Sequence, residues 1–545
     1  MKNVKKFLKL FSLLLVFNSV SGQKATLITK VMEEWFNLRL QGANTRQPLA
    51  NYSDDDLFFS TDSATVIGCL KGYKRSEGFK TGMIYIENEF SRMDHPVVVK
   101  ILEDGRFEAR IPMWYPKVVD IVFNDQEFQC YIEPVQALAI AIDWLAFRNN
   151  ENDKAIQFYG ALAHINRERR NLPLSKADND GLAKQAKKIK PHEFKAKTLQ
   201  EWDIQKRVLD SILTIKKYGD KLSSLARAEL NISMLMRLYD YANERKDQRR
   251  ADPSNTVLQN QLPADFYDFI NHGNIEDNAI FISEQFSHLI NQMEFGPLFK
   301  AANLPDHELH MIGMEKIVRL DNMRDSVAQN ELYLTNGKVY DLIKLHRLIS
   351  ALDPDLRSAS NDSLISYFET IKRSLYNSFY KQQADIIMED ALRKKEGKGI
   401  SLPGSYAGVL FKKLIAPYAG KMIFLDFWAT TCGTCVWDIQ QMRAIRDKYK
   451  DSKDFVFLFI TSEDESPKKA YEAFVRKQKL VNTVYVSSDE YRYLRELFGF
   501  YGIPRYAIIN KEGEVLNRKS EPHEFMIEIN RFNTEVQHPS PTKIY

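Results

Sequence analysis

The spacing of apolar residues changes twice along this 545-residue chain, and no other feature limits the fold as strongly. From about Ala64 to Ile140, short apolar runs alternate with polar positions, which is typical of β-strands. From about Val135 to Lys395, apolar residues recur every three or four positions, as in amphipathic helices. After Gly397, strand-like and helix-like segments alternate, which indicates an α/β sheet with parallel members. Because the chain is too long for one ordinary core, we expect a multidomain protein: an N-terminal small β-sandwich, a central all-α region and a C-terminal α/β domain.

The first 22 residues have the pattern of a secretory signal peptide. Lysines precede an apolar run from Leu10 to Phe17, and the small residues Val20-Ser21-Gly22 follow it. The apolar run is shorter than the roughly 20 residues that cross a bilayer as a helix, so we expect export without stable membrane insertion. The predicted division is a signal peptide (1–22), a β-sandwich domain (23–140), a helical domain (141–395) and an α/β domain (396–545).

Six strands are expected in the N-terminal region, at Ala64 to Leu70, Gly82 to Ile86, Val97 to Leu102, Arg106 to Ile111, Val118 to Phe123 and Phe128 to Ile132. The turn at 103–105 predicts that the third and fourth strands form a hairpin. Cys69 and Cys130 both fall inside strands. In an oxidising compartment they would be either a structural disulfide or two buried thiols, and the sequence leaves both alternatives open.

The central region is predicted to be helical throughout. Its clearest amphipathic segments are Leu199 to Tyr218, Leu222 to Asn243, Glu331 to Leu352 and Ser363 to Lys394, with breaker-rich loops between them.

Charge and cysteine content exclude several classes of function. The 76 basic and 72 acidic side chains nearly balance, so composition gives no case for nucleic-acid binding. Of the four cysteines, only Cys432 and Cys435 form a C-x-x-C pair. A structural zinc site takes four ligands, often as two such pairs, and we therefore expect no metal.

The C-x-x-C pair directly follows the predicted strand Lys421 to Phe427, where a helix begins. Free backbone N–H groups and the helix dipole favour a thiolate at Cys432. Thiolate is the attacking species in disulfide exchange, and Cys435, one helical turn further on, can reach back to resolve a mixed disulfide. The spacing indicates a redox pair.

Two motifs carry a family resemblance. The run Leu425-Asp426-Phe427-Trp428-Ala429, followed by Cys432-Gly433-Thr434-Cys435, resembles the active-site strand and turn of thioredoxins. Far downstream, Tyr501-Gly502-Ile503-Pro504 resembles their cis-proline loop. The intervening strand and helix at 483–498, and the lead-in Gly420-Lys421, are similar to the exported TlpA/ResA-type branch. The resemblance covers about the last 145 residues and implies a thioredoxin fold for 396–545, with the preceding regions arranged as in multidomain members of that branch.

The resemblance also implies roles for individual residues. Cys432 would attack, Cys435 would resolve, and the pair would cycle through a redox-active disulfide without any cofactor. Pro504 would be cis, and the backbone of Ile503 would pair with the substrate chain. Substrate contact is also expected of Trp428, proton transfer of Asp426, and an accessory role of Asp438. For Asp426 a solvated position at the strand end, and for Asp438 a plain surface carboxylate, remain the alternatives.

The motif departs from the family pattern at a few positions. Thr431 stands where a Trp is usual, Thr434 where a Pro is common, and Gln440 where a helix-kinking Pro is expected. These changes bear on redox potential and partner choice. Ala429 stands where a peroxiredoxin would have Thr, which disfavours that class.

These observations predict an exported thiol–disulfide oxidoreductase of the periplasm that reduces cysteines of other proteins. Its partners would be protein disulfide substrates and a dithiol electron donor. The alternative is a periplasmic binding or interaction protein that uses the thioredoxin module as a scaffold. The two hypotheses differ in whether Cys432 is exposed and reactive.

Overall fold

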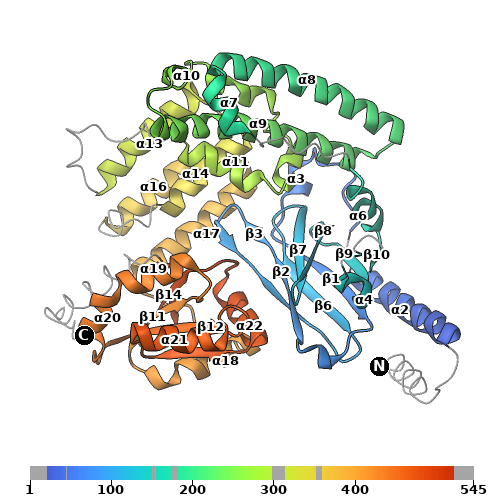
Figure 1. The fold of residues 1–545 in the computed structure, drawn as a ribbon, viewed down its shortest axis with the longest axis vertical. Helices are drawn as coiled ribbons and strands as arrows, with labels where there is room; N and C mark the ends of the chain where they lie inside the picture. The colour runs from blue at the N-terminus through green and yellow to red at the C-terminus, as the bar shows by residue number, and fades with distance from the viewer. Residues whose placement is uncertain are drawn as a thin grey trace.

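The computed structural model describes residues 21–43, 46–149, 151, 155–172, 181–296, 313–350 and 359–520 (Figure 1). The predicted signal peptide lies almost wholly outside these residues. Within them, none of the helices combines the length and apolar character that spanning a membrane requires. Figure 1 shows a β-rich N-terminal part, a helical part above it and a C-terminal α/β part beside it.

The N-terminal part contains two four-stranded sheets. The first has the order β10 (Ile156–Tyr159), β9 (Ala137–Asp143), β1 (Ser63–Lys71) and β6 (Arg106–Pro112). The second has the order β5 (Val97–Lys100), β2 (Thr81–Tyr85), β7 (Lys117–Phe123) and β8 (Gln126–Ile132). The shorter elements here are α2 (Ser21–Ala43), α3 (Asp55–Phe58), η1 (Arg75–Glu77), β3 (Glu87–Asn88) and β4 (Met93–Asp94). All six predicted strands are present, and β9 and β10 continue the β region beyond the expected boundary at 140.

The predicted hairpin of 97–102 with 106–111 is wrong. β5 pairs with β2 in the second sheet, whereas β6 pairs with β1 in the first, so the turn between them carries the chain from one sheet to the other. Both strands bury apolar side chains in the core that the two sheets share. This burial is achieved equally well whether the strands pair with each other or lie in opposite sheets. Phe107 on β6 lies opposite Gly68 on β1, where its ring occupies the space that a Cβ would need.

Cys69 and Cys130 are free thiols, the second of the two alternatives that the sequence leaves open. Cys69 is on β1 and packs beneath helix α2. Cys130 is on β8, in the other sheet, and packs in the large central core. Because they belong to different sheets and different apolar clusters, the structure keeps them apart.

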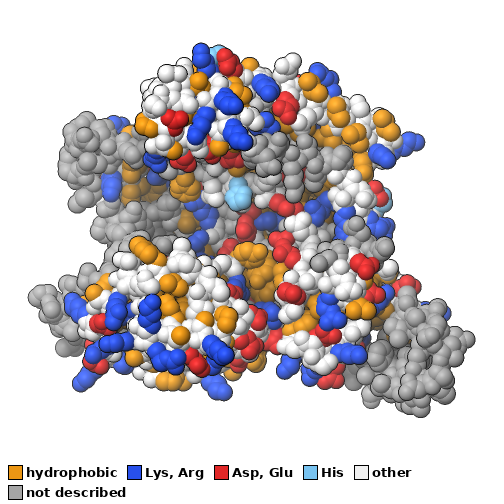
Figure 2. All heavy atoms as spheres, in the orientation of Figure 1, with side chains coloured by type: hydrophobic (Ala, Val, Ile, Leu, Met, Phe, Trp, Pro, Cys, Tyr) orange, Lys and Arg blue, Asp and Glu red, His pale blue; other side chains and the backbone are white. Residues whose placement is uncertain are grey.

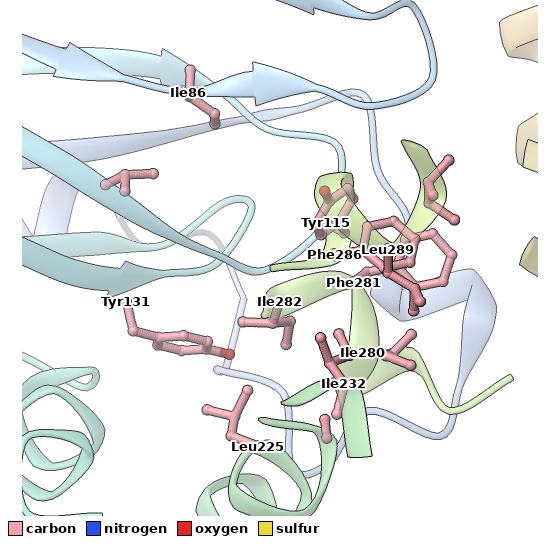
Figure 3. Close-up of a cluster of buried hydrophobic side chains, with 14 of the residues drawn as sticks. Ile86, Tyr115, Tyr131, Leu225, Ile232, Ile280, Phe281, Ile282, Phe286 and Leu289 are labelled. Carbon is pink, nitrogen blue, oxygen red and sulfur yellow. The ribbon is translucent and has the colours of Figure 1, made fainter. Parts of the chain in front are cut away.

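The helical part shares its core with the sheets. Figure 3 shows Tyr115 and Tyr131, from the β region, together with Phe281 and Phe286 from the helical region. The rings of Tyr115 and Phe281 have centroids 5.7 Å apart. The elements are α4 (Trp144–Arg148), α6 (Ala163–Arg169), α7 (Leu182–Lys188), α8 (Pro191–Lys216), α9 (Asp220–Ala251), α10 (Thr256–Gln259), η2 (Phe266–His272), η3 (Asn278–Ile282), α11 (Phe286–Phe295), α13 (Gly313–Asn330), α14 (Lys338–Ser350), α16 (Asn361–Ser374) and α17 (Ser378–Lys395).

The helix expected from Ser363 to Lys394 is two helices. Helix α16 ends where the backbone of Leu375 turns to an extended conformation, with its side chain buried. Asn377 then caps α17 by accepting a hydrogen bond from the Phe379 N–H. A capping asparagine inside an otherwise periodic run is the local signal for this break.

The C-terminal part is a five-stranded sheet covered on both faces. Its strand order is β13-β12-β11-β14-β15, in which β11 runs parallel to β12 and antiparallel to β14. The strands are β11 (Met422–Phe427), β12 (Phe455–Ser462), β13 (Thr483–Val486), β14 (Arg505–Ile509) and β15 (Val515–Ser520). Helices α18 (Tyr406–Ile415) and α22 (Ser488–Phe498) contribute to the core on one face, and α19 (Gly433–Gln441) and α21 (Lys468–Gln478) to that on the other. The remaining elements are η5 (Ala416–Tyr418) and α20 (Arg443–Tyr449).

The C-terminal part contacts the second N-terminal sheet through α22 and the loop after it. Asp489 on α22 accepts a hydrogen bond from the Thr81 hydroxyl at 2.6 Å, and Glu496 accepts one from the Val98 N–H at 2.8 Å. In the following loop, the N–H of Tyr501 donates to Asp94 at 3.2 Å. These contacts place the N-terminal part directly beside the 501–504 motif.

Candidate active site

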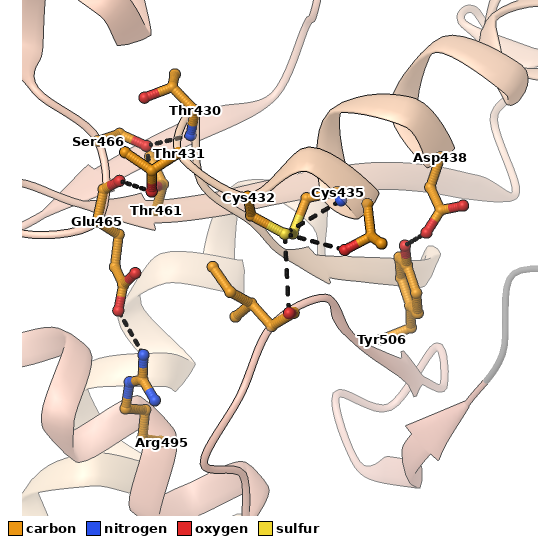
Figure 4. The surroundings of a disulfide bond; sticks show 12 residues. Thr430, Thr431, Cys432, Cys435, Asp438, Thr461, Glu465, Ser466, Arg495 and Tyr506 are labelled. Carbon is orange, nitrogen blue, oxygen red and sulfur yellow. Dashed lines mark hydrogen bonds and ion pairs between the residues drawn. A yellow bond between two sulfur atoms is a disulfide. The ribbon is translucent and has the colours of Figure 1, made fainter. Parts of the chain in front are cut away.

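Cys432 and Cys435 form a disulfide at the C-terminal end of β11, where α19 begins (Figure 4). Cys432 is the N-cap residue of α19, and the N–H of Cys435 points to its sulfur at 3.1 Å. Cys432 is half-buried, whereas Cys435 is fully buried. An incoming sulfur can therefore reach Cys432, while Cys435 stays behind it in the core.

The motif Ile503-Pro504 lies directly against the accessible sulfur. The peptide bond between the two residues is cis, as predicted. The carbonyl oxygen of Ile503 lies 3.7 Å from Cys432 Sγ, and both Ile503 and Pro504 are half-buried. A polypeptide placed along Ile503 would thus have its backbone next to Cys432 Sγ.

Asp426 is buried in the central strand β11, so the solvated alternative is wrong. Its side chain is 3% exposed, and neither carboxylate oxygen has a hydrogen-bond partner among the described residues. Burial raises the pKa of Asp426 well above its ordinary value, the charge of Asp438 raises it further, and Arg446 acts in the opposite direction. A carboxyl group with a raised pKa keeps its proton to a higher pH than a solvent-exposed Asp, which suits it to give up and take back a proton.

Asp438 is held by a residue that the sequence motifs do not indicate. The hydroxyl of Tyr506 donates a hydrogen bond to the Asp438 carboxylate at 2.6 Å. Tyr506 is on β14, where its backbone lies in register with Asp426. The strand pairing therefore places Tyr506 opposite Asp426 while its hydroxyl contacts Asp438, and only the tertiary register reveals this.

The predicted contact of Trp428 with substrate is not available in this structure. Its side chain is fully buried and packs against the ring of Phe474, with centroids 5.0 Å apart. Trp428 follows β11 directly, and the chain enters the core before turning to Cys432. The buried Trp428 ring therefore packs in the core next to the end of β11.

The two threonines that replace the usual Trp and Pro make polar contacts. The hydroxyl of Thr434 lies 3.4 Å from Cys432 Sγ. The hydroxyl of Thr431 donates to the carbonyl oxygen of Glu465 at 3.0 Å, and the N–H of Thr430 donates to Ser466 Oγ at 2.9 Å. The active-site turn is thereby attached to the loop after β12.

Arg495 connects that loop to the 501–504 motif. Its guanidinium forms an ion pair with Glu465 (Figure 4) and donates a hydrogen bond to the carbonyl oxygen of Tyr501. Both loops that flank the disulfide are thus attached to α22 through one partly buried cation. The pattern of α22 predicts a helix but contains no local signal for this role.

Comparison with known protein families agrees with this geometry. Residues 412–533 match the family model described as Redoxin. The C-terminal part of the chain is a thioredoxin-like Redoxin domain. The disulfide and the cis-proline motif both lie inside the matched residues. The search among curated proteins found no match.

Among solved structures, the chain is similar to several small proteins. The thioredoxin domain of a thiol–disulfide oxidoreductase from Bacteroides vulgatus is 18% identical over 22% of this chain and 83% of that one, with a TM-score of 0.20. A thiol:disulfide interchange protein from a Bacteroides species is 18% identical over 27% and 91%, with a TM-score of 0.21. The exposed lipoprotein thioredoxin of Streptococcus pneumoniae is 22% identical over 22% and 89%, with a TM-score of 0.18.

Proposed function

We propose that this protein is a thiol–disulfide oxidoreductase that reduces disulfides in other proteins through Cys432 and Cys435. The observation that carries the proposal is the position of Cys432: its half-buried sulfur lies 3.7 Å from the Ile503 carbonyl oxygen, with Cys435 buried behind it in the disulfide. This arrangement offers one sulfur to a substrate and reserves the other for resolution.

The reaction would begin from the reduced dithiol. The Cys432 thiolate attacks one sulfur of the substrate disulfide, whose S–S bond breaks as the mixed disulfide with Cys432 forms. The Cys435 thiolate then attacks Cys432 Sγ and expels the second substrate thiolate. The substrate gains two electrons and two protons, and the Cys432–Cys435 disulfide returns. A dithiol protein would supply the electrons for the next cycle.

Asp426 would manage the proton of Cys435 in this cycle. As a carboxylate it accepts the proton when Cys435 attacks, and as an acid it returns a proton when the disulfide is reduced again. Its burial and its lack of hydrogen-bond partners among the described residues favour this use over a structural one, because an isolated buried carboxyl group costs stability.

We further propose that the protein works after export, in the periplasm, as a multidomain relative of the TlpA/ResA branch. The signal-like first 22 residues and the strand–helix segment β13–α22 support this assignment. Substrates would then be periplasmic proteins with oxidised cysteines.

Trapping of mixed disulfides tests the proposal. Cys435→Ala leaves Cys432 able to attack but removes resolution, so substrates should stay attached and be released by a strong reductant. Cys432→Ala is the control and should trap none. If the two variants capture the same proteins, and the wild type reduces no disulfide with any dithiol donor, the scaffold alternative replaces this proposal.

A further inference from the structure

A cavity of about 240 Å³ lies where the three parts of the molecule meet. Its walls come from β2, β7 and β8 of the N-terminal part, from the η3–α11 segment of the helical part, and from Tyr501 of the Redoxin domain. Figure 2 shows this face hollowed between the three parts, with acidic side chains gathered along the hollow. No part of the proposed chemistry uses this cavity.

The cavity adjoins the position along Ile503 where the substrate polypeptide is proposed to lie. Tyr501 lines it and stands two residues before Ile503, a separation of at most about 7 Å of backbone. The Ile503 carbonyl oxygen in turn lies 3.7 Å from Cys432 Sγ. A polypeptide that places a cysteine at Cys432 can therefore place a side chain a few residues away in the cavity.

Acidic side chains outnumber basic ones along the walls. The carboxylates are Glu87, Glu89, Asp94, Asp120 and Glu284, against Lys117 and His288. Three of these acids already have basic partners: Glu89 pairs with Lys117 at 2.6 Å, Asp94 with Arg505 at 3.5 Å and Glu284 with Arg169 at 3.6 Å.

Glu87 and Asp120 form no ion pair with any described residue, and neither does Glu127 next to Asp120. Desolvation raises the pKa of Glu87 and the charge of Glu89 raises it further, whereas Lys117 and His288 act in the opposite direction. Desolvation also raises the pKa of Glu127, with Asp120 adding to the effect. These acids repel one another, so a cation that entered between them would be stabilised.

Two aromatic rings, those of Tyr85 and Tyr501, line the cavity on the side of Ile503. Tyr85 and Tyr501 form an edge-to-face pair with centroids 4.3 Å apart, and Tyr501 is 48% exposed. Two arginines whose charges act on Tyr85 already pair with acids, Arg492 with Asp489 and Arg495 with Glu465. Aromatic faces next to carboxylates bind ammonium and guanidinium groups.

We infer that this cavity binds a lysine or arginine side chain of the substrate polypeptide, a few residues from the cysteine that Cys432 attacks. The inference rests on the proposed function and names its substrate class: protein disulfides flanked by basic residues. Asp120 supplies the unpaired charge, and the tyrosine pair supplies the surface for the cation and its alkyl chain.

Single-turnover kinetics with peptide disulfides test this inference. The probes are peptides in which one lysine is moved through three positions on either side of an oxidised cysteine, each matched with a glutamine peptide. The peptide disulfide should oxidise the reduced full-length protein about fivefold faster when lysine, rather than glutamine, stands at one or two of these positions. Added salt should reduce this difference in rate.

Asp120→Asn keeps an acceptor for Gln129, which donates to Asp120 at 3.1 Å, but removes the charge. It should bring the lysine-to-glutamine rate ratio close to one. Asp125→Asn, in the turn of the same β7–β8 hairpin and outside the cavity wall, should keep the wild-type ratio. If Asp120→Asn does not fold, Glu87→Gln takes its place with the same expected loss.

The outcomes separate the two proposals. Equal rates for all lysine and glutamine peptides, or a preference that survives both Asp120→Asn and Glu87→Gln, would overturn the cationic site while leaving the oxidoreductase intact. If the wild type oxidises with none of the peptides and with no protein disulfide, the proposed function fails, and this inference fails with it.

Discussion

The ring of Tyr85, on strand β2 of the N-terminal part, packs edge-on against the ring of Tyr501 in the Redoxin domain, with centroids 4.3 Å apart. Tyr501 begins the motif that ends in Pro504, and its N–H donates to Asp94 of the N-terminal part. The loop that forms one wall of the disulfide site is therefore held from outside the Redoxin domain. This contact joins the N-terminal part to the motif beside the disulfide.

Tyr85→Ala should weaken this support. Loss of an edge-to-face pair costs about 1 kcal/mol, so we expect KM for a neutral peptide disulfide to rise about fivefold with little change in kcat. Tyr85→Phe keeps the ring and should behave like the wild type. Steady-state kinetics of the three proteins make the comparison, and an unchanged KM in Tyr85→Ala would show that the contact does not support the loop.

Cys432 should be the reactive thiol of the reduced protein. Its sulfur faces the Cys435 N–H at 3.1 Å at the start of α19, an arrangement that stabilises a thiolate. We expect Cys432 to alkylate faster than Cys435, with a pH midpoint below the roughly 8.5 of a free cysteine. Cys432→Ser should abolish turnover. Mass spectrometry after timed alkylation measures both rates, and faster labelling of Cys435 would reverse the assigned roles.

Asp426→Asn should change stability and rate in opposite directions. The pKa of Asp426 is raised in the folded protein. Protonated Asp426 therefore contributes stability that is fully present below the unfolded pKa of about 3.9 and is lost as the pH rises through the folded pKa. The melting temperature of the variant relative to wild type should therefore increase from about pH 4 upward. Disulfide exchange near pH 7 should slow about 10-fold.

Thermal unfolding at several pH values and insulin reduction, on the same preparations, measure both effects of Asp426→Asn. A variant that melts lower than wild type at every pH and reduces insulin at the wild-type rate would disprove the proton-transfer role. Asp451→Asn, an exposed acid-to-amide change after α20, is the matched control.

Asp438→Asn should shift the pH dependence that arises from Asp426. The charge of Asp438 is the second cause of the raised pKa of Asp426, after burial. Without that charge, the pKa of Asp426 falls but stays above its ordinary value, and the pH–rate profile of disulfide exchange should move to lower pH. Identical profiles for Asp438→Asn and wild type would show that the two acids are not coupled.

Cys69 and Cys130 should be recovered as free thiols from the unreduced protein. Burial raises the pKa of Cys69 to about 11 and that of Cys130 to about 12, so neither should alkylate in the native protein at pH 8. Both should label fully after denaturation without a reductant. A Cys69–Cys130 peptide in the mass map would contradict the arrangement of the two sheets.

By itself the sequence determined the order of the three regions, most strand positions and the location of the redox pair. These features are local: alternation and helical spacing follow from which side chains face a core, and a C-x-x-C pair after a buried strand indicates a redox pair. The sequence favours burial of Asp426, because a single acid interrupts an apolar strand, but it leaves a solvated position at the strand end open, and only the structure decides between the two.

Only the tertiary structure decided which distant surfaces meet. Strand order and register, which local periodicity does not specify, place β5 and β6 in different sheets. They also determine the burial of Trp428 and the contact of Tyr506 with Asp438. The same holds for Tyr85 and Tyr501, which belong to different parts of the chain. Many strand and helix pairings satisfy the same hydrophobic pattern. Which of them forms depends on how closely the shapes of the buried side chains fit together, so non-local contacts like these follow from the packing of the whole core.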